Sequence, residues 1–281
     1  MKRIYAASLP LMLLFISQAS IVWANGANEP EKPKPACEIK LLIDSSRVLD
    51  ENHLLNESIR EQLGIREEYQ TIRAVYLDTP ERSFLDAGWV NRIRQKQGKS
   101  KYTITYKKRY AILNNDIETA LASALKDGFT PGDPRFAAEI DWGYSNMTLS
   151  FSSDIEIKIK ELPDITKLTC SDAIQMLTDH MPLEEKKNAS VPESIQLVGP
   201  IEFLRYSGVL NGEEIRIEVW PIADTGGLRY IVELSAKYEN LNEAAAIRNS
   251  IIKKLDEMGI LIHRDALKTR LILNGLDTLK D

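Results

Sequence analysis

The sequence predicts an α+β protein in which an antiparallel β-barrel of eight or nine strands forms a tunnel and helices pack outside it. Three observations favour this class. Short segments alternate charged and apolar residues with the period of a β-strand. Hairpin-type turn signals separate neighbouring segments, which favours antiparallel pairing over βαβ units. Several stretches with apolar residues at helical spacing are available to cover one face of the sheet.

Residues 1–24 have the character of a cleaved signal peptide. Lys2 and Arg3 precede an apolar run that extends from Ile4 to Trp23, and Val22–Ala24 offers the small-residue pattern that signal peptidase prefers. The run is also long enough for a retained membrane anchor, but its polar residues favour cleavage. We therefore expect an exported protein, periplasmic or secreted, without a stable membrane span after cleavage.

The polar, proline-rich stretch 25–36 predicts a disordered leader, and 37–281 predicts a single folded domain. The formal net charge is −5 at pH 7. Removing residues 1–24 takes away two cations and no acids, so the mature chain carries about −7. This balance argues against a general nucleic-acid binder. A locally basic face within a net acidic protein instead indicates a small polyanionic ligand. The oligomeric state does not follow from the sequence.

The first folded segment, 37–44, reads as an amphipathic strand with its apolar residues at alternate positions. Residues 45–66 are expected to be mostly helical or irregular. Three strands follow, near 70–78, 88–95 and 100–110, and a turn at 96–99 joins the last two.

The middle of the chain mixes helices and strands. Asn114, Asn115 and Asp116 supply N-cap chemistry for a helix that ends near Lys126. Two strands are expected, and after them Ser171 and Asp172 cap a helix that ends near His180. Residues 184–195 are polar and predict a surface loop. The two strands lie at 136–142 and 146–160.

The last third predicts a second set of strands and two helices. Asn211–Gly212 is a hairpin turn signal, and Gly226–Gly227 marks another turn. The helix at 241–258 has apolar residues at helical spacing, and a last helix is expected over 264–273. The strands are predicted at 196–209, 213–220 and 228–237.

Charged residues share one parity on successive predicted strands, and apolar residues share the other. One interpretation is a one-sided sheet with its charges in solvent. The other is that the helices cover the apolar face, so that the charged face lines an interior containing both signs of charge. The repetition over six strands favours the second. The charged parity includes Arg92, Arg94, Lys107, Arg109, Arg205, Arg216, Glu218 and Glu233.

A lumen of this kind suits phosphoryl transfer from a linear polyphosphate. Many Lys and Arg side chains are needed to neutralise such a substrate, and guanidinium groups match phosphate oxygens in bidentate fashion. A hard divalent cation, Mg²⁺ or Mn²⁺, needs carboxylates, and it polarises the phosphoryl group and activates water.

At these residues the sequence resembles the CYTH-type family, also called the triphosphate tunnel metalloenzymes. Its pattern is E-x-E-x-K, then Y-x-D-T-P, a glycine, R-x-R and T-x-K. The order and spacing fit over 37–110 and fit more weakly over 197–258. The matching residues here are Glu38 and Lys40, Tyr76 to Pro80, Gly88, Arg92 and Arg94, and Thr105 and Lys107.

The resemblance implies an antiparallel tunnel that binds triphosphate compounds with a divalent metal, Mg²⁺ or Mn²⁺. It also implies that the stretch 111–195 is an insertion relative to compact members, placed to cap the tunnel or bury one face. The implied metal ligands are Glu38, Glu218 and Glu233. The implied phosphate-binding residues are Lys40, Arg92, Arg94, Lys107 and Arg205.

The chain departs from the family pattern at acidic positions. Ala36, Arg216 and Ser235 stand where carboxylates are expected, whereas the basic set is nearly complete. Two functions therefore stay open: a metal-dependent phosphohydrolase acting on a triphosphate or polyphosphate, and a catalytically degenerate binding protein for a phosphorylated ligand. The acids Glu139 and Asp141 are interpreted either as a substitute metal site or, preferably, as exposed residues of an edge strand.

Two further alternatives stay open from the residues alone. Cys37 and Cys170 either form one disulfide after export or are free buried thiols. Trp89, Trp142 and Trp220 either stack on an organic group of a ligand or, as is more common, are buried in the core.

Overall fold

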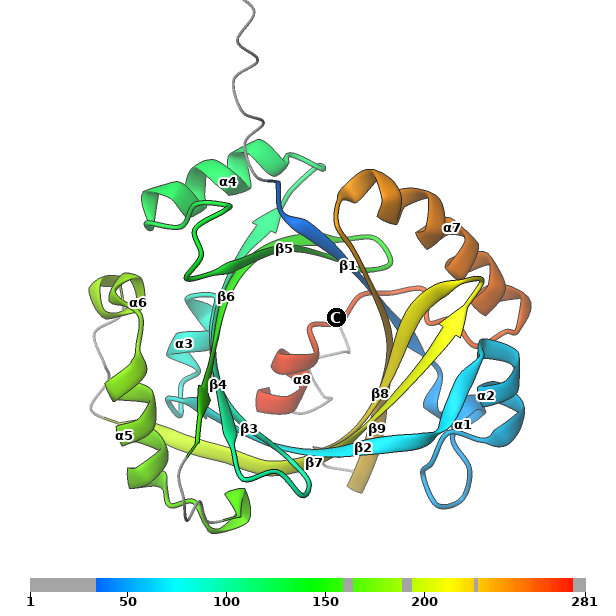
Figure 1. The fold of residues 1–281 in the computed structure, drawn as a ribbon, viewed down its shortest axis with the longest axis horizontal. Helices are drawn as coiled ribbons and strands as arrows, with labels where there is room; N and C mark the ends of the chain where they lie inside the picture. The colour runs from blue at the N-terminus through cyan, green and yellow to red at the C-terminus, as the bar shows by residue number, and fades with distance from the viewer. Residues whose placement is uncertain (1–33, 159–163, 189–193, 225–226, 275–281) are drawn as a thin grey trace, which may run out of the picture. The chain divides into compact units, whose positions relative to one another are not determined.

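The computed structural model describes residues 34–158, 164–188, 194–224 and 227–274. Within these ranges nine strands close into a barrel in the order β1-β5-β6-β4-β3-β2-β7-β8-β9 (Figure 1). β1 and β5 pair in parallel, and the other pairs are antiparallel. The predicted α+β barrel is thus confirmed. The predicted signal peptide and most of the predicted leader lie outside the described residues.

The predicted strands are all present, and several extend further than predicted. The strands are β1 Ala36–Ile43, β2 Ile65–Asp78, β3 Trp89–Lys96, β4 Tyr102–Ile112, β5 Ala137–Trp142, β6 Met147–Ile157, β7 Gln196–Leu210, β8 Glu213–Asp224 and β9 Gly227–Tyr238. The helices are α1 Ser45–Val48, α2 Glu57–Leu63, α3 Ser83–Asp86, α4 Ile117–Lys126, α5 Cys170–His180, α6 Leu183–Asn188, α7 Leu241–Glu257 and α8 Lys268–Asn274, with a 3-10 turn at Ile165–Lys167.

The apolar parity of the strands faces outward, beneath the helices. On β4, Tyr102, Ile104 and Tyr106 are at most 1% exposed and pack against Ala173 and Leu177 of α5. α4 covers β4 and β6 in the same way, α1 and α7 cover the side formed by β1 and β9, and α2 packs on β2 and β7 (Figure 1). Because successive side chains alternate, the charged parity must point into the barrel.

Towards one end of the barrel the inward-facing positions change from charged to apolar. On β1 the next inward-facing residue after Lys40 is Leu42, and on β8 the next one after Glu218 is Trp220. These apolar residues form one cluster with Leu271 of α8. α8 therefore lies inside the ring rather than outside it (Figure 1). The predicted helix at 264–273 is confirmed, but its place within the barrel was not predicted.

Local turn chemistry follows the sequence with one exception. Asp116 caps α4 by accepting from the backbone N–H of Thr119, and Asn211–Gly212 forms the β7–β8 turn with positive φ at both residues. The exception is α5, which begins at Cys170 and is capped by Thr169 rather than by Ser171. Of the helices that the structure describes, none combines the length and the apolar character needed to cross a bilayer.

The surface loop predicted over 184–195 is wrong at its start, because Leu183–Asn188 form α6. Glu185 of this helix is fully buried and accepts a hydrogen bond from Asn91 Nδ2 at 2.8 Å. Burial raises the pKa of Glu185 to about 7. Glu185 Oε2 and Asn91 Oδ1 have no hydrogen-bond partner among the described residues. A protonated Glu185 carboxyl has an O–H donor that the ionised form lacks.

Glu185→Gln should therefore remove a pH dependence of stability. In the wild type the folded pKa of Glu185 lies above its usual value near 4.5, so stability falls as pH rises from about 4.5 to about 7. A glutamine stays neutral, so the variant should gain about 2 kcal/mol relative to wild type between pH 5 and pH 8 in urea unfolding. Glu118→Gln, an exposed site on α4, is the matched control. Parallel pH profiles for wild type and Glu185→Gln would contradict this account.

Candidate ligand and metal site in the bore

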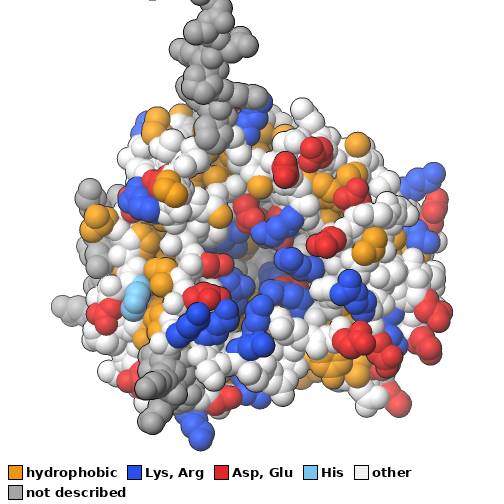
Figure 2. Space-filling view, in the orientation of Figure 1, with side chains coloured by type: hydrophobic (Ala, Val, Ile, Leu, Met, Phe, Trp, Pro, Cys, Tyr) orange, Lys and Arg blue, Asp and Glu red, His pale blue; other side chains and the backbone are white. Residues whose placement is uncertain are grey.

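The inward faces of the strands enclose a cavity of about 1080 Å³, which we call the bore. Its lining contains thirteen Lys or Arg side chains and eight Asp or Glu side chains, an excess of five cations. The whole chain carries net −5, so positive charge is concentrated where the barrel is hollow. Figure 2 shows Lys and Arg gathered around the central hollow. Such a concentration attracts anions.

One side of the bore is a cationic wall formed by Arg92, Arg94, Lys107 and Arg109 of β3 and β4. Arg92 makes no hydrogen bond or ion pair with any described residue, and its guanidinium carbon lies 5.9 Å from the centre of the Tyr76 ring. Nε of Arg92 and Arg94, and both Nε and Nη1 of Arg109, are buried without hydrogen-bond partners. The wall therefore places guanidinium and ammonium groups with few protein partners around the bore, as a site for oxyanions does.

The arginines of the wall also repel one another. Arg94 donates from Nη2 to Thr105 Oγ1 at 3.1 Å and lies 3.3 Å from Asp154. Arg92 beside it, together with burial, lowers the pKa of Arg94 to about 10. The group stays charged at neutral pH. Like charges held together without enough counter-charge are stabilised when an anion binds between them.

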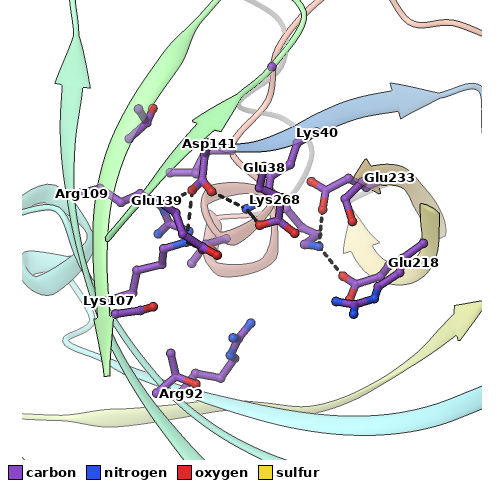
Figure 3. Close-up of a pocket in the computed structure, with 18 of the residues that line it drawn as sticks. Glu38, Lys40, Arg92, Lys107, Arg109, Glu139, Asp141, Glu218, Glu233 and Lys268 are labelled. Carbon is purple, nitrogen blue, oxygen red and sulfur yellow. Dashed lines mark hydrogen bonds and ion pairs between the residues drawn. The ribbon is translucent and has the colours of Figure 1, made fainter. Parts of the chain in front are cut away.

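Beside the wall, Glu38, Glu139 and Asp141 form a carboxylate trio whose ligand atoms lie within 4.8 Å of one another. Lys40 Nζ is 2.9 Å from Glu38 and 2.8 Å from Asp141, and Lys107 Nζ is 3.2 Å from Asp141 (Figure 3). The trio is therefore neutralised by lysines in this structure. Clustered carboxylate oxygens are also the ligands that hard divalent cations prefer.

Burial and charge act against each other in the trio. Burial opposes ionisation of Asp141, but Lys107 and Lys40 outweigh it and hold the pKa of Asp141 below its usual range. Glu38 is also buried, and Lys40 and Lys237 hold its pKa below its usual range. Burial, only partly offset by Asp141, lowers the pKa of Lys107 to about 8. Glu38 and Asp141 are therefore ionised at neutral pH, with lysines as their counter-charges.

The preferred interpretation of Glu139 and Asp141 as exposed residues of an edge strand is wrong. β5 is bonded on both sides, to β1 and β6, so it has no free edge. The side chains of Glu139 and Asp141 are 13% and 11% exposed and line the bore. In the β1–β5 register Asp141 lies opposite Glu38 and Glu139 lies opposite Ala36. β5 thus supplies a carboxylate at the level where β1 lacks one.

A second acidic group in the bore is the carboxylate pair formed by Glu218 and Glu233, which are register partners on β8 and β9. Lys268 of α8 donates to Glu218 Oε2 at 2.5 Å and to Glu233 Oε1 at 2.7 Å (Figure 3). Arg205 donates to Glu218 from Nη2 at 2.7 Å. Burial opposes ionisation of Glu218, but Lys268 and Arg205 keep its pKa well below its usual range. Sequence reasoning missed Lys268, because nothing in the helix pattern indicated that α8 enters the barrel.

The structure brings all eight predicted site residues to the bore. The predicted phosphate-binding residues lie on both sides: Lys40 with the trio, and Arg205 with the carboxylate pair. The predicted metal ligands are divided, with Glu38 in the trio and Glu218 and Glu233 in the pair. The residues concerned are Glu38, Lys40, Arg92, Arg94, Lys107, Arg205, Glu218 and Glu233.

The positions of the tryptophans and cysteines decide between the alternatives that the sequence left open. Trp89 and Trp220 are 2% and 0% exposed and belong to the core, and Trp142 packs under the guanidinium of Arg248 at 4.7 Å. Cys37 is buried and Cys170 is exposed, and both are free thiols. Burial raises the pKa of Cys37 to about 12, so it is not a reactive thiol.

A closed antiparallel tunnel with a cationic bore and clustered carboxylates defines a class of protein that accommodates phosphate-rich ligands. A family model described as the CYTH domain matches residues 35–261. The chain belongs to the CYTH domain family, and the resemblance predicted from its motifs is confirmed. Comparison with curated proteins gave no match.

Three similar solved structures come from different organisms. A candidate adenylyl cyclase from Hippeastrum, described as having a dominant triphosphatase activity, is 12% identical with a TM-score of 0.47, and the match covers 85% of this chain and 95% of that one. A candidate adenylate cyclase from Bacillus halodurans is 15% identical with a TM-score of 0.47, over 84% and 96% of the two chains. A third, from Vibrio parahaemolyticus, is 12% identical with a TM-score of 0.43, over 85% and 99%.

Asp141→Asn should destabilise the fold by about 3 kcal/mol in urea unfolding, because it leaves Lys40, Lys107 and Arg109 without their shared carboxylate in a buried setting. The matched control is Asp154→Asn, which breaks the pair with Arg94 at a side chain that is 54% exposed and should cost less than about 1 kcal/mol. If both variants lost the same free energy of unfolding, Asp141 would not be needed to neutralise the surrounding cations, which would contradict this account.

Proposed function

We propose that this protein is a metal-dependent phosphohydrolase that binds a triphosphate or a linear polyphosphate in the bore. The observation that carries the proposal is the cationic wall, whose arginines lack enough protein counter-charge, beside the carboxylate trio. Ligand oxygens would supply the missing counter-charge. A hydrophobic or neutral ligand would leave these like charges unmatched.

Phosphate binding is assigned to Lys40, Arg92, Arg94, Lys107 and Arg205, all of which line the bore. Arg92 has no competing ion pair among the described residues, so it is the first contact that we expect an incoming phosphate to make. Two arginine forks held side by side match the oxygens of adjacent phosphoryl groups. Lys40 and Lys107 both pair with Asp141 of the trio, so they would contact the ligand at the level of the carboxylates.

The trio fits a hard divalent cation, Mg²⁺ or Mn²⁺, because its donors are three carboxylates that converge within 4.8 Å. When bound there, such an ion supplies charge neutralisation at the phosphoryl group and a water of lowered pKa. Glu38, Glu139 and Asp141 would hold it. Lys40, Lys107 and Lys237 neutralise these carboxylates in this structure, and with an ion at the trio Lys40 and Lys107 could donate to phosphate oxygens instead. Of the metal ligands implied by the family pattern, Glu38 is retained in this assignment.

A binding protein without catalysis is the second candidate. One observation favours it: the Glu218–Glu233 pair is already occupied by Lys268 and Arg205, so it offers no open ligand position for a metal ion. Arg216 and Ser235 in the same part of the bore add no carboxylate. On this alternative the ligand is recognised by the same cationic wall but is not cleaved.

Purified protein should release phosphate from tripolyphosphate only when Mg²⁺ or Mn²⁺ is present, and tripolyphosphate should raise its melting temperature. Replacing Arg92 and Arg94 together with Ala should weaken tripolyphosphate binding at least about 100-fold, because two charge-assisted forks are lost. Arg66→Ala, outside the bore on β2, is the matched control. Stabilisation without phosphate release favours the binding protein. The proposal fails if tripolyphosphate neither stabilises the protein nor is cleaved.

We also propose that the protein is exported, on the strength of the basic start, the apolar run and the small-residue site in residues 1–24. Cleavage after Ala24 should give a mature chain that begins at Asn25. Intact-mass measurement of protein recovered from the periplasm or the medium checks this prediction. A recovered chain that still carries residues 1–24 in the membrane fraction would indicate a retained anchor instead.

A further inference from the structure

Lys268 holds the position between the two carboxylates of the Glu218–Glu233 pair. Its ammonium nitrogen lies 2.5 Å from Glu218 Oε2 and 2.7 Å from Glu233 Oε1, and 4.9 Å from the centre of the Trp220 ring (Figure 3). The side chains of Lys268, Glu218 and Glu233 are 16%, 12% and 9% exposed. Two buried carboxylates this close to each other need a cation between them. Lys268 is that cation.

Glu218 has little room for any other cation. Its Oε1 accepts from Arg205 Nε at 2.9 Å and from Nη2 at 2.7 Å. Its Oε2 accepts from Trp220 Nε1 at 2.9 Å as well as from Lys268. Both oxygens are therefore engaged by protein donors from three elements. A divalent ion would have to displace the ammonium to reach this pair.

The segment that carries Lys268 is fixed at both ends. Asp265 accepts hydrogen bonds from the backbone N–H groups of Tyr144, Ser145 and Asn146, in the turn between β5 and β6. Arg82 donates to the carbonyl oxygen of Leu273 at 2.6 Å, at the other end of α8. These hydrogen bonds to Asp265 require a glycine at position 143, because a Cβ there would lie 2.0 Å from Asp265 Oδ1.

Apolar packing holds α8 inside the barrel. Leu271, Ile272 and Leu273 are 2%, 8% and 6% exposed and belong to the cluster that closes this end of the bore. Withdrawing Lys268 by moving the helix would expose these three side chains, at about 1.5–3 kcal/mol for each. The ammonium is therefore a permanent part of the bore rather than a mobile surface charge.

We infer that Lys268 is a tethered cation that takes the place of a divalent ion between Glu218 and Glu233, so that the protein binds one divalent ion, at the carboxylate trio. The inference rests on the proposed function of the bore and adds a residue to it. An ammonium has three N–H donors, and Lys268 uses two of them on the carboxylate pair. The third is available to an oxygen of the phosphate ligand, since Lys268 lines the bore.

The charge difference makes the inference measurable. An ammonium brings one positive charge to two carboxylates, of which Arg205 also contacts Glu218, whereas a divalent ion brings two. Removing the lysine charge leaves the pair under-neutralised and opens two carboxylate oxygens at once. The vacated position should then bind Mn²⁺, which is readily coordinated by carboxylate oxygens.

Titration calorimetry with Mn²⁺ on the full chain tests this. The wild type should bind one Mn²⁺, and Asp141→Asn should weaken that site. Lys268→Met should bind two, and Lys268→Met/Glu233→Gln should return to one. Lys253→Met, an exposed lysine on α7 with side-chain exposure of 78%, is the matched control and should bind one.

Lys268→Met is expected to be less stable without metal, so melting temperature supplies a second measurement. Mn²⁺ should raise the melting temperature of Lys268→Met more than that of the wild type, and the excess should vanish in the double variant. Two Mn²⁺ in the wild type, or no added Mn²⁺ and no excess stabilisation in Lys268→Met, would overturn the inference. Tripolyphosphate binding by the wild type reports separately on the proposed function, because it does not depend on how many Mn²⁺ bind.

Discussion

The structure depends on one constraint: each strand of the closed ring has two faces, and the helices cover the outer one. Along β4, Tyr106 packs beneath α5 while Lys107, the next residue, points into the bore. Strand alternation allows no intermediate arrangement, because a shift of one residue would bury lysines under helices and place tyrosines in the bore. The hydrophobic effect stabilises the fold by burying the outer face of the strands, and it thereby also places the cationic face in the interior of the barrel.

Gathering charges in a cavity creates a neutralisation problem, and the bore solves it with local partners. Lys40 and Lys107 neutralise the carboxylate trio, and Lys268 and Arg205 neutralise the carboxylate pair. Each arrangement depends on a contact between distant parts of the chain. The trio requires β1 and β5 to pair in parallel, and the pair requires α8 to enter the barrel. Closure of the barrel therefore positions the site as well as stabilising the fold.

The strands, the charged parity and the basic residues of the site could be predicted because they follow from local alternation and from short motifs. Glu139 and Asp141 have the same alternation, but their location depends on a parallel pairing with β1 that no local pattern encodes. Lys268 could not be predicted for a similar reason. Its helix looks like any short helix in sequence, and only the apolar inward residues at one barrel end, such as Leu42 and Trp220, provide the surface that draws it inside.

The wall differs from the rest of the bore because its charges are not fully matched. Arg109 is buried with two nitrogens that make no hydrogen bond and only a 4.0 Å ion pair to Asp141, and Arg92 has no ion pair among the described residues, although acids are available two strands away. Natural interiors rarely leave such donors unsatisfied, because each costs free energy in the folded state. The cost is tolerable where a bound anion supplies the missing counter-charge, since binding then recovers it. The unmatched arginines, more than the number of cations, therefore mark this part of the bore as the place where an anion belongs.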